Sequence, residues 1–69
     1  MYIHFVTRSE RNWLQTLANI LDSAQENDVV VVFSDDAAEL ARNALKRRPD
    51  GKYLRVMTQE TYETLEKQP

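Results

Sequence analysis

The sequence predicts a small α/β domain built on a three-stranded parallel sheet. Three short apolar runs, at 2–6, 29–33 and 53–57, each end at a hydroxyl residue and are followed by a stretch with helical spacing. This alternation is typical of β-α-β-α-β-α order, and connections of this length imply parallel pairing with right-handed crossovers. We therefore expect one domain over residues 1–69, equivalent to half of a Rossmann-like fold.

The patterns of the three runs predict the strand order. The middle run, Val29–Phe33, is apolar on both faces, as a central parallel strand is. The outer two runs alternate, with Ile3 and Phe5 on one face of the first. This favours order 1-2-3, which places the first two helices on the same face of the sheet. Order 2-1-3 is the alternative and would divide those helices between the two faces.

The first helix is expected from Ser9 to about Gln25, and its apolar residues fall within one arc of a helical wheel. They are Trp13, Leu14, Leu17, Ala18, Ile20, Leu21 and Ala24.

The second helix is expected from about Asp36 to Arg47, and alanines on its inner side permit a close approach to the sheet. A turn follows at Pro49–Gly51, where proline disfavours helix and Asp-Gly favours a turn. The third helix should run from Gln59 to about Lys67.

With order 1-2-3, one face of the sheet lacks the first two helices. The predicted strand alternation gives this face six side chains of mixed character: Tyr2, His4, Val6, Tyr53, Arg55 and Met57. Such a face is too apolar for open water and too polar for a core. Either the C-terminal helix folds across it, or a second copy of the chain covers it and forms a homodimer.

Composition narrows the classes of function. The chain has 69 residues, a net charge of −2, no cysteine and one histidine, so disulfides are excluded and a histidine-rich metal site is disfavoured. A small core without such supplements favours a partner subunit. The absence of a basic excess disfavours nucleic-acid binding. Without an apolar run long enough for a membrane span, we expect a cytoplasmic protein.

The carboxyl ends of the predicted strands are where a ligand would bind in an open parallel sheet. The residues gathered there that could hold an anionic ligand are Arg8, Ser9, Arg11, Ser34, Asp35 and Asp36. The same junctions must also cap helices, and Thr7 with Glu10 and Asp36 with Glu39 have capping-box spacing. We favour capping as the main role of Ser34, Asp35 and Asp36.

The segment VVVVFSDDAAELARNAL, residues 29–45, resembles the second half of a Toprim domain, in which a strand ends in two metal-binding aspartates spaced D-x-D. Aligning Asp36 with the second aspartate places Ser34 at the first, and Thr7 falls where the family has a glutamate. Two of three acidic positions are lost, so the resemblance implies a shared topology without the metal chemistry.

Other catalytic signals are weak. The first strand–helix junction contains no glycine for a phosphate-binding loop. His4 has no second histidine or cysteine with which to bind a metal, and no serine stands at hydrolase-motif spacing from it. We therefore assign no catalytic residue, metal ligand or cofactor.

The outer face of the first helix is polar but nearly uncharged. Asn12, Gln15 and Asn19 lie on it, and such depletion of charge is typical of the centre of a protein interface. Lys46–Arg48 form the main basic cluster, which suits the C-terminal end of a helix.

The sequence thus favours a non-catalytic interaction or regulatory module that binds a protein partner and itself. A small cellular regulator or a phage-type inhibitor would suit this description. Its expected interface residues are Tyr2, His4, Tyr53, Arg55, Met57, Asn12, Gln15 and Asn19. The alternative is a protein that binds a small anionic ligand or a nucleotide at the carboxyl edge.

Overall fold

Strands and helices alternate along the chain as the apolar runs predict. The computed structural model describes residues 2–48 and 52–67; the predicted turn at 49–51 lies outside them. The elements are β1 (Ile3–Phe5), α1 (Trp13–Ser23), β2 (Val29–Val32), α2 (Asp35–Lys46), β3 (Arg55–Thr58) and α3 (Gln59–Glu66).

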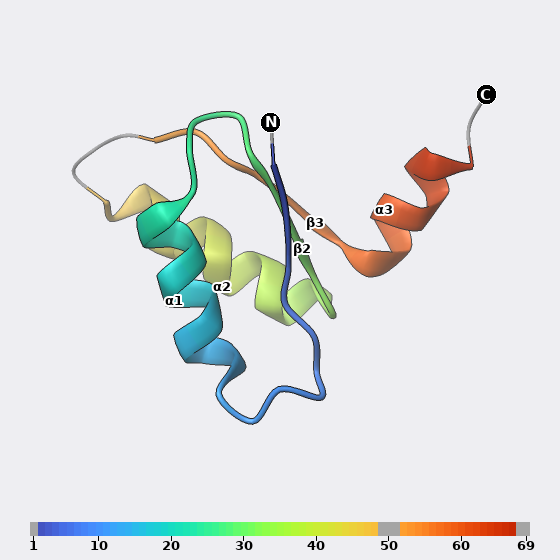
Figure 1. Cartoon of the computed structure of the whole chain (residues 1–69), viewed down its shortest axis with the longest axis horizontal. Helices are drawn as coiled ribbons and strands as arrows, with labels where there is room; N and C mark the ends of the chain where they lie inside the picture. Colours follow the sequence, from blue (N-terminus) through green and yellow to red (C-terminus); the bar gives the residue numbers. More distant parts are fainter. Residues whose placement is uncertain (1, 49–51, 68–69) are drawn as a thin grey trace.

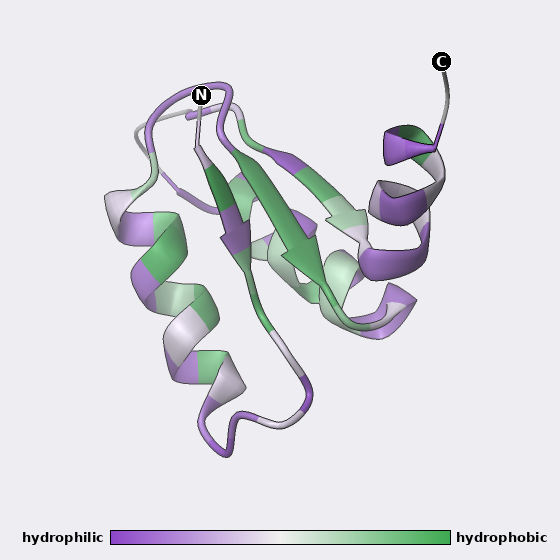
Figure 2. Cartoon of the chain, turned by 45° about the vertical axis from the view of Figure 1, so that its right-hand side comes forward, coloured by the Kyte–Doolittle hydropathy of each residue, from purple (hydrophilic) through white to green (hydrophobic). Residues whose placement is uncertain are grey.

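The three strands form one parallel sheet in the order β1-β2-β3 (Figure 1). The preferred order is confirmed, and the alternative 2-1-3 is wrong. All four residues of β2 are buried, which agrees with its apolar character on both faces. Figure 2 shows β2 as a hydrophobic strand between its two neighbours.

The main core lies between one face of the sheet and the pair α1 and α2. Leu17 and Leu21 of α1 meet Val30 and Val32 of β2 there, together with small residues of α2 such as Ala41, which is fully buried. Alanine lets α2 approach the strands closely, since it adds little side-chain volume. α3 lies on the other side of the sheet, where the ring of Tyr62 packs edge-on against Phe5 at 5.6 Å between centroids (Figure 1).

The prediction of which β1 side chains lie on which face of the sheet is wrong by one residue. His4 pairs with Val30, which in turn pairs with Val56, so His4 and Val6 lie on the face covered by α1 and α2. Val6 is buried there. Phe5 instead shares its face with Met57. Because side chains alternate along a strand, this one-residue error moves Tyr2, His4 and Val6 away from the face of Arg55 and Met57.

The start of α1 also differs from the prediction. The helix begins at Trp13 after a turn, with Asn12 at its N-cap position and no side-chain capping bond. The predicted capping box of Thr7 and Glu10 does not form, because the Glu10 carboxylate instead accepts a hydrogen bond from the Thr16 hydroxyl at 2.7 Å.

The predicted apolar arc of α1 is too wide. Leu14 is 52% exposed, and Ala18 also faces solvent. Leu17, Leu21 and Ala24 supply the buried part of the helix face.

Hydroxyl residues cap the other two helices. The Ser34 hydroxyl accepts a hydrogen bond from the Ala37 amide at 3.2 Å, and the Thr58 hydroxyl accepts one from the Thr61 amide at 3.2 Å. The capping role of Ser34 is confirmed, and the box of Asp36 with Glu39 is wrong because α2 already begins at Asp35. Asp35 and Asp36 occupy its first turn, where acidic side chains complement the helix dipole.

The domain is compact. Its Cα radius of gyration of 11.7 Å is close to the roughly 11 Å expected of a compact domain of this length. Within residues 2–48 and 52–67, no helix combines the length and the apolar composition that crossing a bilayer requires.

Candidate functional site

The predicted ligand residues at the carboxyl edge are largely engaged in local structure. The guanidinium of Arg8 lies 5.2 Å from the ring centroid of Phe33, a cation–π distance. The Ser9 hydroxyl lies 3.1 Å from that of Thr7, and Ser34 caps α2. Arg11 is exposed in the turn before α1. Arg8, Ser9 and Ser34 therefore each contact another group of the chain.

The two adjacent aspartates line different hollows. Asp35 lines a groove beside β3, whereas Asp36 lines a smaller hollow on α2 together with Glu39 and Asn43. In the described part of the chain, no cluster of three or more acidic, histidine or cysteine side chains is suited to hold a metal ion. Of the two positions aligned with the metal-binding pair of a Toprim domain, Ser34 uses its hydroxyl to cap α2 and only Asp36 carries a carboxylate.

His4 and Tyr2 belong to a structural cluster around Asp28. The buried Asp28 carboxylate accepts hydrogen bonds from the Tyr2 amide at 3.0 Å and the Gln25 amide at 3.0 Å, and its other contact is His4 Nε2 at 3.1 Å. These bonds, with that of His4 first in effect, lower the pKa of Asp28 from 3.8 to about 2. Asp28 thereby ties the start of β1 to the loop before β2.

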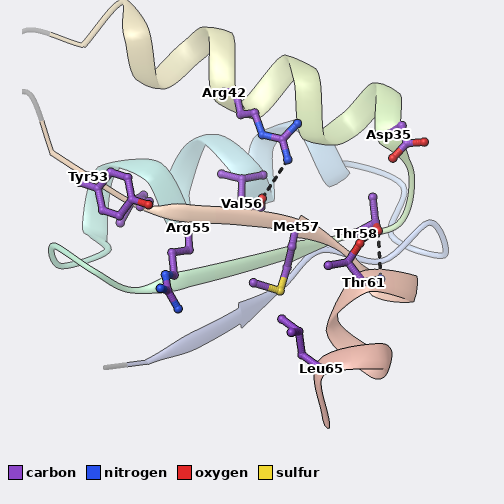
Figure 3. A pocket seen from close by; sticks show the side chains of 10 residues that line it. Asp35, Arg42, Tyr53, Arg55, Val56, Met57, Thr58, Thr61 and Leu65 are labelled. Carbon is purple, nitrogen blue, oxygen red and sulfur yellow. Dashed lines mark hydrogen bonds between the residues drawn. The ribbon is translucent and has the colours of Figure 1, made fainter. Parts of the chain in front are cut away.

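A hollow on the described surface follows β3 (Figure 3). We call it the β3 groove, and its volume is about 650 Å³. Asp35 and Arg42 of α2 line one side, residues 53–58 form the floor, and Thr61 and Leu65 of α3 contribute to the other side.

The floor of the β3 groove is the unpaired edge of the sheet. β3 is an outer strand, and the Arg55 amide donates inward to the Asp28 carbonyl at 2.9 Å. Backbone groups alternate in direction along a parallel strand, so those of Leu54 and Val56 point outward, away from β2. An edge of this kind can accept a further strand.

Arg42 partly protects this edge. Its guanidinium donates a hydrogen bond to the outward Val56 carbonyl at 3.1 Å (Figure 3). A basic side chain laid over a strand edge is one way in which proteins limit uncontrolled pairing. Both Arg42 and Arg55 are exposed, and neither forms an ion pair with another described residue.

A second hollow continues the β3 groove towards the C-terminal end of α2. We call it the basic hollow; its volume is about 420 Å³ and it shares Arg42, Tyr53 and Leu54 with the groove. Its further charged side chains are Lys46, Arg48 and Lys52. Arg48 pairs with Asp22 of α1, and the Lys52 ammonium donates to the Asp22 carbonyl at 3.4 Å.

The predicted interface residues divide into three groups. Tyr53, Arg55 and Met57 come together in the β3 groove. Tyr2 and His4 lie at the far edge strand, with their rings 4.7 Å apart.

The third group lies on α1. Asn12, Gln15 and Asn19 are exposed there, and the Gln15 amide donates to the Asn19 side chain at 3.1 Å. The exposed Leu14 accompanies them.

Sequence patterns did not identify Arg42, Thr61 or Leu65 as neighbours of β3. They come from two helices on opposite sides of the edge strand, and no local spacing relates them. The predicted strand order 1-2-3 could have indicated this groove, because it makes the third strand an edge strand of the sheet. An apolar, partly basic strand at an edge needs protection or a partner.

We compared the chain with protein-family models, with curated proteins and with solved structures, and none of them matched.

Proposed function

We propose that the chain is a non-catalytic protein-interaction module that binds an extended segment of a partner protein along the β3 groove. The observation that carries this proposal is the open edge of β3 lying in a groove between α2 and α3. Addition of a strand to such an edge is a recurrent mode of peptide recognition, in which backbone hydrogen bonds supply affinity and flanking side chains supply specificity.

The local roles of the side chains at the carboxyl edge of the sheet support a protein-binding function over a catalytic one. Ser34 uses its hydroxyl to cap α2, and Asp35 and Asp36 line separate hollows. Arg8, one of the two arginines expected to hold an anionic ligand at this edge, lies over the ring of Phe33. A small regulator or inhibitor of another protein needs only an edge strand that binds its partner, so this role fits the chain better than catalysis does.

Self-association stays a prediction and, in our proposal, uses a surface other than β3. Two copies pairing through β3 would bring Arg42 and Arg55 of each into the same interface, where like charges repel. The exposed α1 surface around Leu14, Gln15 and Asn19 carries no net charge and is the better candidate.

The test is selection of peptides from an unbiased library against the chain and two proline variants. Val56→Pro removes an outward amide from the β3 edge, and Ile3→Pro removes an outward amide from the β1 edge. Proline is tolerated at such positions because the amide takes no part in the ladder. Circular dichroism establishes that both variants fold.

The proposal predicts peptides that bind the wild type and Ile3→Pro but lose binding to a folded Val56→Pro. Selected peptides that bind all three proteins equally would contradict it. If Val56→Pro does not fold, Arg42→Trp, which fills the groove without altering the backbone of β3, replaces it and must also abolish binding.

A further inference from the structure

We propose that the preferred occupant of the β3 groove is an extended peptide in which acidic and apolar residues alternate. This inference rests on the proposed strand addition and adds the chemistry of the partner. It follows from a difference between the two sides of the strand edge.

The side of the edge that faces α2 is basic. Arg42 lies there, and the basic hollow adds Lys46, Arg48 and Lys52. On this side the β3 groove and the basic hollow contain four basic side chains and one acidic one, Asp35, in a chain with nine Lys and Arg and a net charge of −2. Arg48 pairs with Asp22 and Lys52 donates to the Asp22 carbonyl, so Arg42 and Lys46 supply the positive charge on which the proposal depends.

The side that faces α3 is mainly apolar. Met57 of β3 and Leu65 of α3 point into the same space below the strand in Figure 3, and Leu65 is 51% exposed. Arg55 lies on this side, towards the end of the groove near Tyr53 (Figure 3).

Because the two sides of the edge differ, the geometry of an added strand predicts which peptide sequences bind best. Successive side chains of an extended peptide point to opposite faces of the sheet that it joins. One set therefore faces Arg42 and the basic hollow, and the other faces Met57 and Leu65. Acidic residues suit the first set and apolar residues the second, so the preferred sequence alternates with a period of two.

The same geometry favours a peptide over a nucleic acid. A polynucleotide could also use the basic side chains, but the outward groups of Leu54 and Val56 alternate between donor and acceptor at the spacing of a polypeptide strand. A phosphate backbone offers acceptors only and would give no donor to the outward Leu54 carbonyl, whereas the Val56 carbonyl already accepts from Arg42.

The experiment measures the affinity of short labelled peptides by fluorescence polarisation. The first peptide alternates glutamate with valine over about eight residues, which is within the usual range of strand lengths. Three controls have the same length. One has the same composition in two blocks, one carries glutamine in place of glutamate, and one carries N-methyl groups on two adjacent central residues, which blocks both strand edges and keeps the charge.

We expect the alternating acidic peptide to bind tightest. Replacing glutamate with glutamine should weaken binding about tenfold or more, because several charge contacts of modest strength are lost together. Arg42→Gln and Lys46→Gln should each weaken it about two- to fivefold. Arg11→Gln, in the turn before α1 and outside the groove, should leave it unchanged.

The outcomes separate this inference from the proposed function. Equal binding of the glutamine and glutamate peptides, with loss of binding on N-methylation, overturns the acidic preference and leaves strand addition standing. Equal binding of the N-methylated peptide overturns both. An oligothymidylate that competes as strongly as the acidic peptide, and whose binding is also weakened by Arg42→Gln, overturns the peptide assignment in favour of nucleic acid.

Discussion

Two leucines of α1 provide a sharp test of the core. Both belong to the apolar arc that the sequence predicts, but Leu21 is 2% exposed and Leu14 is 52% exposed. We consider the substitutions Leu21→Ala and Leu14→Ala, which remove the same atoms from the same helix.

The structure sets the expected magnitudes. A fully buried leucine replaced by alanine loses its transfer free energy and leaves a cavity, which costs about 3–4 kcal/mol. At Leu14 about half of the side chain is already in water and solvent fills the space left, so the cost should be about 1 kcal/mol. A domain of this size has an unfolding free energy of roughly 3–10 kcal/mol, so the Leu21 variant should be severely weakened.

Urea unfolding followed by circular dichroism measures both variants. With a slope of about 1 kcal/mol per molar urea, Leu21→Ala should lower the midpoint by about 3 M and Leu14→Ala by about 1 M. A Leu21→Ala chain that is unfolded without urea agrees with the reasoning if Leu14→Ala stays folded. Equal losses, or a larger loss at Leu14, would refute the placement of α1 on the sheet.

Three further predictions concern acid stability, capping and self-association. Asp28 has a folded-state pKa near 2, below its ordinary 3.8, so it stabilises the fold above pH 4 and this contribution is lost as pH falls towards 2. Asp28→Asn should flatten the dependence of melting temperature on pH over that interval, and an unchanged slope would contradict the role. Ser34→Ala should cost about 1 kcal/mol through the lost cap of α2, whereas Ser9→Ala, whose hydroxyl caps no helix, should cost under about 0.5 kcal/mol in the same urea assay. Sedimentation equilibrium should show concentration-dependent dimers that Leu14→Lys disrupts, and a monomer at every concentration would rule the homodimer out.

The strand order and two of the helix caps were predicted correctly, because the sequence patterns behind them have a direct physical cause. A run apolar on both faces, Val29–Phe33, can be satisfied only at the centre of a sheet that is covered on both sides, so the order of strands followed. Ser34 and Thr58 stand where a strand turns into a helix, and the unpaired first amides of a helix favour a hydroxyl there.

Alternation alone could not predict which side chains of β1 lie on which face of the sheet. Ile3 and Phe5 are more apolar than His4 and Val6, so alternation alone favours the wrong pair for the face covered by α1 and α2. Contacts remote in sequence decide between them: Asp28 holds His4 on one side, and Tyr62 covers Phe5 on the other. The β3 groove depends on such contacts too, because Arg42 and Leu65 meet β3 only in the folded chain.

The central claim is that the outward edge of β3, where Arg42 holds the Val56 carbonyl and the Val56 amide is open, pairs with an extended acidic chain. Amide hydrogen exchange at Val56 and Arg55, followed by NMR with and without the alternating acidic peptide, tests it most directly. We predict that the Arg55 amide, bonded to Asp28, is protected throughout. The Val56 amide should exchange rapidly in the free protein and at least about tenfold more slowly when the peptide saturates it. A Val56 amide that is already protected in the free chain, or one that stays unprotected at saturation, would contradict the claim.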